Sequence, residues 1–392
     1  MDSLTQVVNT NANATHLSLK TSLAPSVSNF EERVKHSTHA DKTALIEAFR
    51  VLKEQYPTHL ALRSRRCGKT TMLTMFQSFF EKADPKTVEE RRKLYENTPL
   101  VISKSSMVET YFAQHPMKQH FDNIVIAEFE RHEEMGHFKD LDKRSEASLK
   151  RVLEGLEAHR CQAFYVLAKI LKKDNLLDVH GAIMAGIIRI EQTGFLSGLN
   201  NLLTFSLDSP ISTPLERAYS IAFLFTIEEV ETIFIHYAQR NYPFTIRDLR
   251  EWYGGYCTTE GHELFNPWSI CRALETCSLR SFWTASGIDN ILLRRISTSR
   301  DDFQKSLGFL LGGRGVLKPS QSCRVGIADD MTKDELLNVL HYTGYLTGKV
   351  TLDFISVWFC LIDLASAQDN LLRIPNRELQ GNFFFMGIEH ND

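Results

Sequence analysis

The sequence predicts an α/β protein, in which a parallel sheet flanked by helices is followed by a smaller, mainly helical region. Two observations predict the sheet. Short apolar segments at 60–62, 121–130 and 180–190 are each typical of a buried strand, and helical patterns separate them along the chain. The first segment leads into Gly68-Lys69-Thr70-Thr71 and then into an amphipathic run, which is the strand–loop–helix context of a phosphate-binding loop. Strands and helices that alternate around such a loop favour a parallel, doubly wound arrangement.

The remaining elements follow from composition and spacing. The first 24 residues are polar and rich in Asn, Thr and Ser, and we expect them to form a flexible, disordered arm. From residue 254 onward the chain turns aromatic and rich in loops, and this region predicts a helical subdomain that packs its aromatic side chains in a core rather than stacking them on bases. Helical patterns cover residues 30–49, 69–80, 82–98, 144–174 and 226–253. The aromatic residues concerned are Trp252, Tyr253, Tyr256, Trp268 and Trp283.

The phosphate-binding loop predicts the ligand. Backbone N–H groups at a helix start face an anion, a lysine reaches the outer phosphates, and a hydroxyl can hold Mg²⁺. We therefore expect Lys69 to contact phosphate and Thr70 to be the metal ligand. Arg63 stands where the full pattern has its first glycine, and it should add positive charge near the phosphates, together with Arg65 and Arg66. The predicted nucleotide-binding residues are Arg66, Cys67, Gly68, Lys69, Thr70 and Thr71.

Bulk properties exclude several classes of protein. The 392 residues carry a net charge of −3, which does not favour a general nucleic-acid-binding surface. Seven scattered cysteines without a Cys-x-x-Cys pair fit reduced thiols better than disulfides or a zinc site, and the 14 histidines show no metal-ligand spacing. No signal pattern or bilayer-spanning apolar run is present, so we expect an intracellular protein of cytoplasm or nucleus with no membrane partner.

Eight short motifs, in the same order along the chain, resemble those of the AAA-ATPase-like family. Residues 41–43 resemble its "vDKT" signature, and residues 62–70 resemble its "lxRPRRFGKS/T" loop, in which the first glycine is normally absent. Residues 252–256 and 265–269 are similar to its "WYdGY" and "yNPwS" motifs. The other matching stretches are 186–201, 223–230, 342–347 and 374–378.

The resemblance implies an architecture and a ligand. Members of the family commonly join a P-loop NTPase domain to a C-terminal nuclease-like domain of the PD-(D/E)xK type. It thus implies a P-loop domain at 25–235, an aromatic-rich accessory region at 236–345 and an atypical, truncated tail at 346–392. It further implies ATP and Mg²⁺ as cofactors, together with protein partners, and nucleic acid only by analogy with the family.

Three departures from the family pattern bear on catalysis. The nearest match to its Walker B strand, "IDEYD", is 126–130, where Ala127 replaces the aspartate that anchors Mg²⁺ and Glu128 remains as a base for the attacking water. The same stretch could match an earlier family strand instead, which would leave the chain without Walker B. Residues 350–369 interrupt the pattern and are interpreted as an insertion or a retained intron. No PD-(D/E)xK arrangement follows residue 300, so a nuclease site would be cut off.

The sequence thus predicts an ATP-binding protein whose hydrolysis is weak or lost. If hydrolysis occurs, Glu128 would position water and Arg189 would sense the γ-phosphate, because the carboxyl ends of neighbouring parallel strands bring such residues together with Lys69. Two alternatives stay open. One is a non-catalytic interaction scaffold derived from a decayed NTPase, and the other is the truncated remnant of an ATPase–nuclease fusion.

Overall fold

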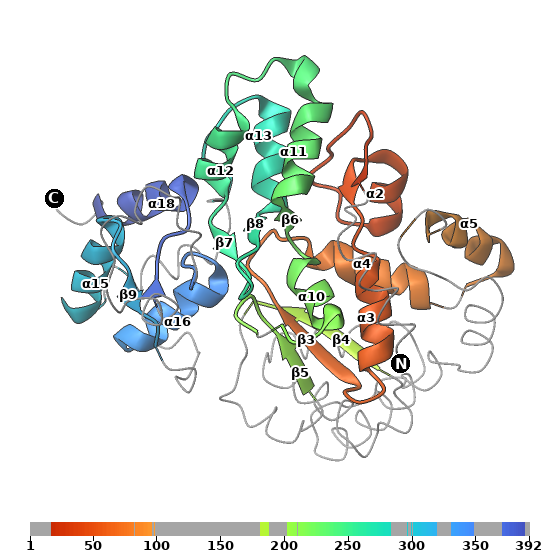
Figure 1. Cartoon of the computed structure of the whole chain (residues 1–392), viewed down its shortest axis with the longest axis horizontal. Coiled ribbons are helices and arrows are strands. Elements are labelled where there is room, and N and C mark those ends of the chain that lie inside the picture. Colours follow the sequence, from red (N-terminus) through yellow and green to blue (C-terminus); the bar gives the residue numbers. More distant parts are fainter. Residues whose placement is uncertain are drawn as a thin grey trace, which may run out of the picture.

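A three-stranded parallel sheet lies at the base of the molecule, in the order β4-β3-β5 (Figure 1). The central strand β3 (Thr58–Leu62) pairs along its length with β4 (Ala182–Gly186) and with β5 (Leu202–Phe205). The α/β class and the strand expected at 60–62 are confirmed, the strand expected at 180–190 is confirmed over 182–186, and β5 was not predicted. The computed structural model describes residues 17–81, 83–95, 98, 181–187, 202–209, 211–283, 296, 299, 301–319, 331–348 and 371–388. The strand expected at 121–130 lies outside these residues.

Helices that precede and follow the three strands in the chain pack around this sheet. Helix α3 (Ala44–Leu52) packs against α10 (Pro214–Ile221), and α4 (Lys69–Phe80) contacts β4. Helix α2 (Phe30–His36) packs on α4 and on α5 (Pro85–Tyr95), the charged helix expected over 82–98. The helix that follows the central strand, after a short loop, is therefore packed against α2 and β4.

A second unit stands above the sheet in Figure 1. Its small antiparallel sheet has the order β6-β8-β7, and two buried aromatic residues, Phe225 and Phe265, face each other across the β6–β8 pair. The helices expected over 226–253 are confirmed, with a break between the two longer ones. The elements are β6 (Phe225–Thr226), α11 (Ile227–His236), η2 (Ala238–Arg240), α12 (Ile246–Tyr253), β7 (Tyr256–Cys257), β8 (Glu263–Phe265) and α13 (Pro267–Thr276).

Local sequence fixes where several of these helices begin. In α10, α11, α12 and α16 a threonine accepts from a backbone N–H in the first turn, and an acidic residue three positions later accepts from the backbone N–H of that threonine. Such a capping box satisfies two of the donors that a helix start leaves unpaired. The Thr-x-x-Glu/Asp spacing therefore predicts each of these four starts.

The C-terminal elements form a third unit at the opposite side from α5 (Figure 1). Helix α18 contacts α12 and α15, and β9 pairs antiparallel with β10. The segment expected as an atypical tail, 346–392, thus supplies a strand and a helix to the packed structure. The elements are α15 (Asp301–Leu311), β9 (Val316–Leu317), α16 (Lys333–Thr343), β10 (Leu371–Leu372) and α18 (Arg377–Ile388).

Part of the segment expected as a disordered arm is also packed. Strand β1 (Leu17–Ser18) pairs with β2 (His39–Ala40), and Leu23 is only 2% exposed. The side chain of Leu23 belongs to the apolar cluster of α11–α13. The expectation of a flexible arm therefore fails for residues 17–24.

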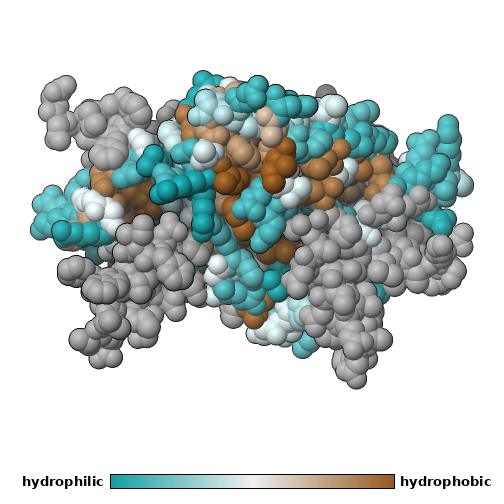
Figure 2. Space-filling view, turned by 45° about the horizontal axis from the view of Figure 1, so that its top comes forward, coloured by the Kyte–Doolittle hydropathy of each residue, from teal (hydrophilic) through white to brown (hydrophobic). Residues whose placement is uncertain are grey.

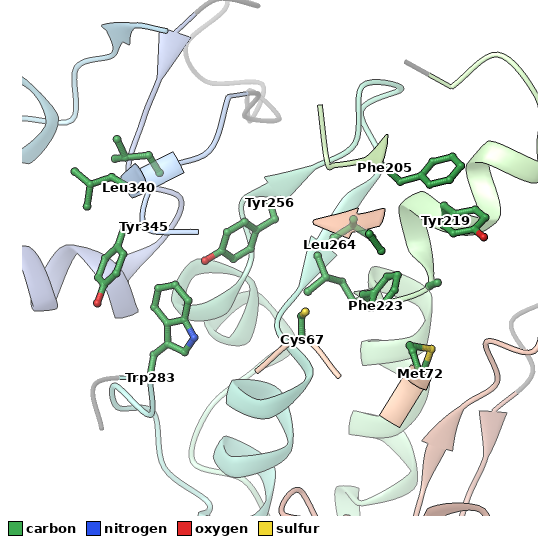
Figure 3. Packing of buried hydrophobic residues seen from close by; sticks show 14 of the residues in the cluster. Cys67, Met72, Phe205, Tyr219, Phe223, Tyr256, Leu264, Trp283, Leu340 and Tyr345 are labelled. Carbon is green, nitrogen blue, oxygen red and sulfur yellow. The ribbon is translucent and has the colours of Figure 1, made fainter. Parts of the chain in front are cut away.

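One apolar core joins the sheet to the C-terminal unit, and a second is built around α11–α13. Figure 3 shows the first core running from Phe205 and Tyr219, past Tyr256 and Trp283, to Leu340 of α16. On the face drawn in Figure 2, hydrophobic residues gather across the middle of the molecule, with hydrophilic residues along its upper edge. No helix among the described residues is long and apolar enough to cross a bilayer.

Candidate functional site

The loop between β3 and α4 places a helix start at the carboxyl end of the central strand. Gly68 caps α4 in the left-handed conformation, with φ of 86°, and Lys69 is the first helical residue. Glycine is suited to this position because a side chain disfavours positive φ. The unpaired N–H groups and the positive end of the helix dipole make such a helix start attractive to an anion.

The ammonium group of Lys69 folds back over this loop. Its Nζ donates to the carbonyl oxygen of Ser64 at 2.5 Å and to that of Arg63 at 3.2 Å, and it lies 3.8 Å from the sulfur of Cys67. The thiol of Cys67 is buried, which raises its pKa, and it donates to the Ser64 carbonyl at 3.0 Å. The ammonium group of Lys69 is thus held at the loop by carbonyl oxygens that an anionic ligand could replace.

A cavity of about 330 Å³ lies over this helix start. All six residues predicted to bind nucleotide line it, from Arg66 to Thr71. Thr70, the predicted metal ligand, is in the first turn of α4 and is exposed to solvent. The other walls of the cavity are formed by Pro25, Ser26, Val27, Ser28, Arg33, His39, Ala40, Lys42, Met72, Ala222, Phe223, Leu224, Phe225, Pro267, Trp268 and Cys271.

Arg63 does not contribute charge to this cavity, so that part of the sequence interpretation is wrong. Its side chain is 2% exposed and donates to the carbonyl oxygens of Leu62, Phe205 and Tyr219 at 2.7, 3.0 and 2.7 Å. The guanidinium also lies 5.3 Å from the ring centre of Phe223. Burial lowers the pKa of Arg63 to about 10, which still leaves it charged at neutral pH. Arg63 ties the end of β3 to β5 and α10 instead of facing a ligand.

Arg66 does lie at the cavity, fixed against one wall. Its backbone has a positive φ of 57°, which is uncommon for a side-chain-bearing residue. Its Nη1 donates to the Phe282 carbonyl oxygen at 2.7 Å, and the guanidinium lies 4.5 Å from the ring centre of Trp268. Stacking on an aromatic ring orients a guanidinium while leaving it charged.

Long-range contacts that the sequence did not reveal hold the loop. The carbonyl oxygen of Arg65 accepts from the side chains of Asn266 at 3.1 Å and Trp283 at 3.4 Å. Gly344 has φ of 89°, and a β-carbon there would lie 2.5 Å from the β-carbon of Ser64. The "NPwS" and "TGYLT" motifs thus touch the loop although they follow it by some 200 residues or more. In the sequence, these contacts were indicated only by the fact that both motifs follow the loop motif in the order of the family that they resemble.

Glu378 braces the same wall from helix α18. Its carboxylate accepts from the backbone N–H of Phe282 at 2.7 Å and from the hydroxyl of Ser269 at 2.8 Å. It is 4% exposed, and this burial raises the pKa of Glu378 to about 7, against the opposing effect of both hydrogen bonds. The backbone of Phe282 therefore contacts Glu378 through its N–H and Arg66 through its carbonyl oxygen.

We expect Glu378→Gln to change the pH dependence of stability. The pKa of Glu378 is about 7 in the folded protein and about 4.5 in the unfolded chain. Between these values the unfolded chain loses this proton more readily, so the stability of wild type falls as pH rises from about 4.5 to 7. Glutamine can keep both hydrogen bonds and does not titrate. From pH 4 to pH 8, the stability of the variant relative to wild type should rise by about 3 kcal/mol. Urea unfolding at both pH values measures this, with the exposed Glu228→Gln as reference, and a difference independent of pH would contradict it.

Two predicted catalytic residues cannot be placed at the cavity. Glu128, with the proposed Walker B stretch, and Arg189, which follows β4, both lie outside the described residues, as does the segment 350–369. Within the described part of the chain, no cluster of His, Cys, Asp and Glu side chains has the geometry of a metal site. Of the aromatic residues, Tyr253, Tyr256 and Trp283 are buried, as core packing predicts, whereas Trp268 lines the cavity.

Comparisons with known proteins add little to this geometry. No family model matches the chain, and no solved structure gives a significant match. A curated protein of Azotobacter chroococcum mcd 1, described as an uncharacterized protein in the vnfD 5' region, is 28% identical over 180 residues. The matched stretch covers 45% of this chain and 30% of that protein. Its description states no activity, so function has to be argued from the site.

Proposed function

We propose that this chain binds a nucleoside triphosphate, ATP with Mg²⁺, in the cavity at the start of α4. One observation carries the proposal: the central strand of a parallel sheet runs through a loop into a helix capped by left-handed Gly68, with Lys69 folded over that loop. The resemblance of eight ordered motifs to the AAA-ATPase-like family supports it, and we assign the chain a P-loop NTPase-type fold on this basis.

The residues present fit such a ligand. The ammonium group of Lys69 would exchange the carbonyls of Ser64 and Arg63 for β- and γ-phosphate oxygens, which are stronger acceptors. The N–H groups of Gly68 to Thr71 would surround the phosphates, and the exposed hydroxyl of Thr70 would complete the coordination of Mg²⁺. Bound Mg²⁺ would neutralise phosphate charge at this position.

Tight binding with weak or absent hydrolysis is the form of the function that we favour. Ala127 stands where the family has its Mg²⁺-anchoring aspartate, and loss of that carboxylate removes electrostatic stabilisation of phosphoryl transfer. Glu128 would be left to position water, and Arg189 to sense the γ-phosphate. Nucleotide binding would then act on protein partners through conformation rather than through turnover.

The deciding experiment compares wild type with Lys69→Ala. Removal of an ammonium group that binds two phosphate oxygens should weaken MgATP binding by about thirtyfold or more, because hydrogen bonds to charged groups contribute about 1.5–3 kcal/mol. Titration calorimetry measures the affinity, and phosphate release measures any hydrolysis. Lys305→Ala, on an exposed position of α15, is the matched control and should bind as wild type does.

The outcomes separate an interaction scaffold, a nucleotide-binding protein without turnover and an ATPase. Equal, negligible affinity of wild type and Lys69→Ala for MgATP would eliminate the proposal and leave the interaction scaffold. Binding by wild type without phosphate release would support a nucleotide-binding protein that has lost hydrolysis. Turnover that disappears in Lys69→Ala would instead make the chain an ATPase.

A further inference from the structure

The cavity extends from the phosphate loop to a second wall near the N-terminus of the described chain. Residues 25–28, the histidine of β2 and Cys271 of α13 form this end. Thr74 of α4 fixes the position of this wall, because its hydroxyl oxygen accepts from the Phe30 N–H at 3.0 Å and lies 3.2 Å from the Ser28 carbonyl oxygen. The start of α4 and this wall line the same cavity, so the base of a nucleotide that binds through its phosphates at α4 has room to lie against this wall.

This wall suits an uncharged, flat group. Pro25, Val27 and Ala40 are apolar, and burial raises the pKa of the Cys271 thiol to about 12, so that it stays neutral. The one guanidinium here, that of Arg33, donates through Nη2 to the carbonyl oxygens of Ala24, Pro25 and Val27 and thereby fixes the backbone of the wall.

His39 offers a hydrogen-bond acceptor at this wall. Its Nδ1 lies 3.2 Å from the Ser37 carbonyl oxygen. A carbonyl can only accept, so Nδ1 must carry the proton. Burial lowers the pKa of His39, against the opposing effect of that hydrogen bond, and the ring is neutral near pH 7. Nε2 then has a lone pair that can accept a hydrogen bond.

We infer that His39 selects a purine that carries a 6-amino group, by accepting a hydrogen bond from that group through Nε2. The inference rests on the proposed function and adds the base to it. Guanine and hypoxanthine have a carbonyl at C6, which would face the Nε2 lone pair with a second acceptor. The hydroxyls of Ser26 and Ser28 can donate or accept by rotation, so they do not distinguish these bases.

The test measures affinities of the full chain for ATP, inosine triphosphate and purine riboside triphosphate, each with Mg²⁺. Inosine triphosphate replaces the 6-amino group by a carbonyl, and purine riboside triphosphate only removes the amino group. Wild type should bind ATP about tenfold more tightly than inosine triphosphate, since a polar group is left facing an unsuitable partner. Purine riboside triphosphate should lose severalfold in affinity.

The variant His39→Phe keeps a flat ring and removes the acceptor, so its affinities for ATP and inosine triphosphate should lie within about twofold. The matched control, His36→Phe, lies on an exposed position of α2 outside the cavity and should keep the tenfold preference. Should His39→Phe fail to fold, His39→Gln replaces it, because a rotatable amide can donate or accept and should likewise lose the preference.

Each result decides a separate question. A wild type that binds all three triphosphates equally, or a His39 variant that keeps the preference for ATP, overturns the role of His39 and leaves triphosphate binding intact. A wild type that binds none of them overturns the proposed function itself. A preference for ATP that the His39 variants lose and His36→Phe keeps supports the inference.

Discussion

Arg63→Met should destabilise the protein by about 3 kcal/mol or more, because three carbonyl groups lose a charged donor in a buried setting. Methionine fills much of the same volume but offers no N–H to the carbonyl oxygens of Leu62, Phe205 and Tyr219. The contact of the guanidinium with the Phe223 ring is lost as well. Denaturant unfolding, followed by circular dichroism, measures the change in free energy.

A matched control exists on the surface. Arg240 also donates to a carbonyl oxygen, that of Leu274 at 3.3 Å, and lies 4.9 Å from the ring centre of Tyr237, but its position is exposed. Water can replace its contacts, so Arg240→Met should cost less than about 1 kcal/mol. Equal effects of the two substitutions would show that Arg63 has no special role in joining the strands.

Arg63 also shows what the sequence could and could not predict. Its position in an arginine-rich loop next to Gly68-Lys69 indicated a phosphate contact, and the local pattern correctly placed β3, α4 and the loop between them. Whether an arginine faces a ligand or the interior depends on β5 and α10, which lie more than 130 residues away. Local spacing carries no information on such partners.

The same limit applies to the rest of the site. The six loop residues were predicted because a helix start that follows a strand is a local feature, and all of them line the cavity. The opposite wall was not predicted, since it brings together residues 25–28, β2 and α13 through tertiary packing alone. Short strands such as β5, with four residues, lack the length over which alternation becomes visible.

The Lys42–Glu229 pair should produce the other large effect on stability. The Lys42 ammonium group lies 2.7 and 2.9 Å from the two carboxylate oxygens of Glu229, and the side chains are 7% and 3% exposed. Lys42→Met leaves the carboxylate buried, and among the described residues the remaining donor to it is the backbone N–H of Thr226 at 2.9 Å. We expect a loss of about 3–5 kcal/mol, which is typical when one partner of a buried pair is removed.

The double variant Lys42→Met/Glu229→Gln tests whether the buried charge is the cause. Glutamine can still accept from Thr226 and carries no charge, so the double variant should recover much of the stability lost in Lys42→Met. Arg50→Met, which breaks the half-buried Arg50–Glu47 pair, should cost only about 0.3–0.5 kcal/mol. If the effects of Lys42→Met and Glu229→Gln simply add in urea unfolding, the two side chains are not coupled. Coupling would mean that the helix start of α11 and the loop before α3, whose Lys42 lines the cavity, are held together by this ion pair.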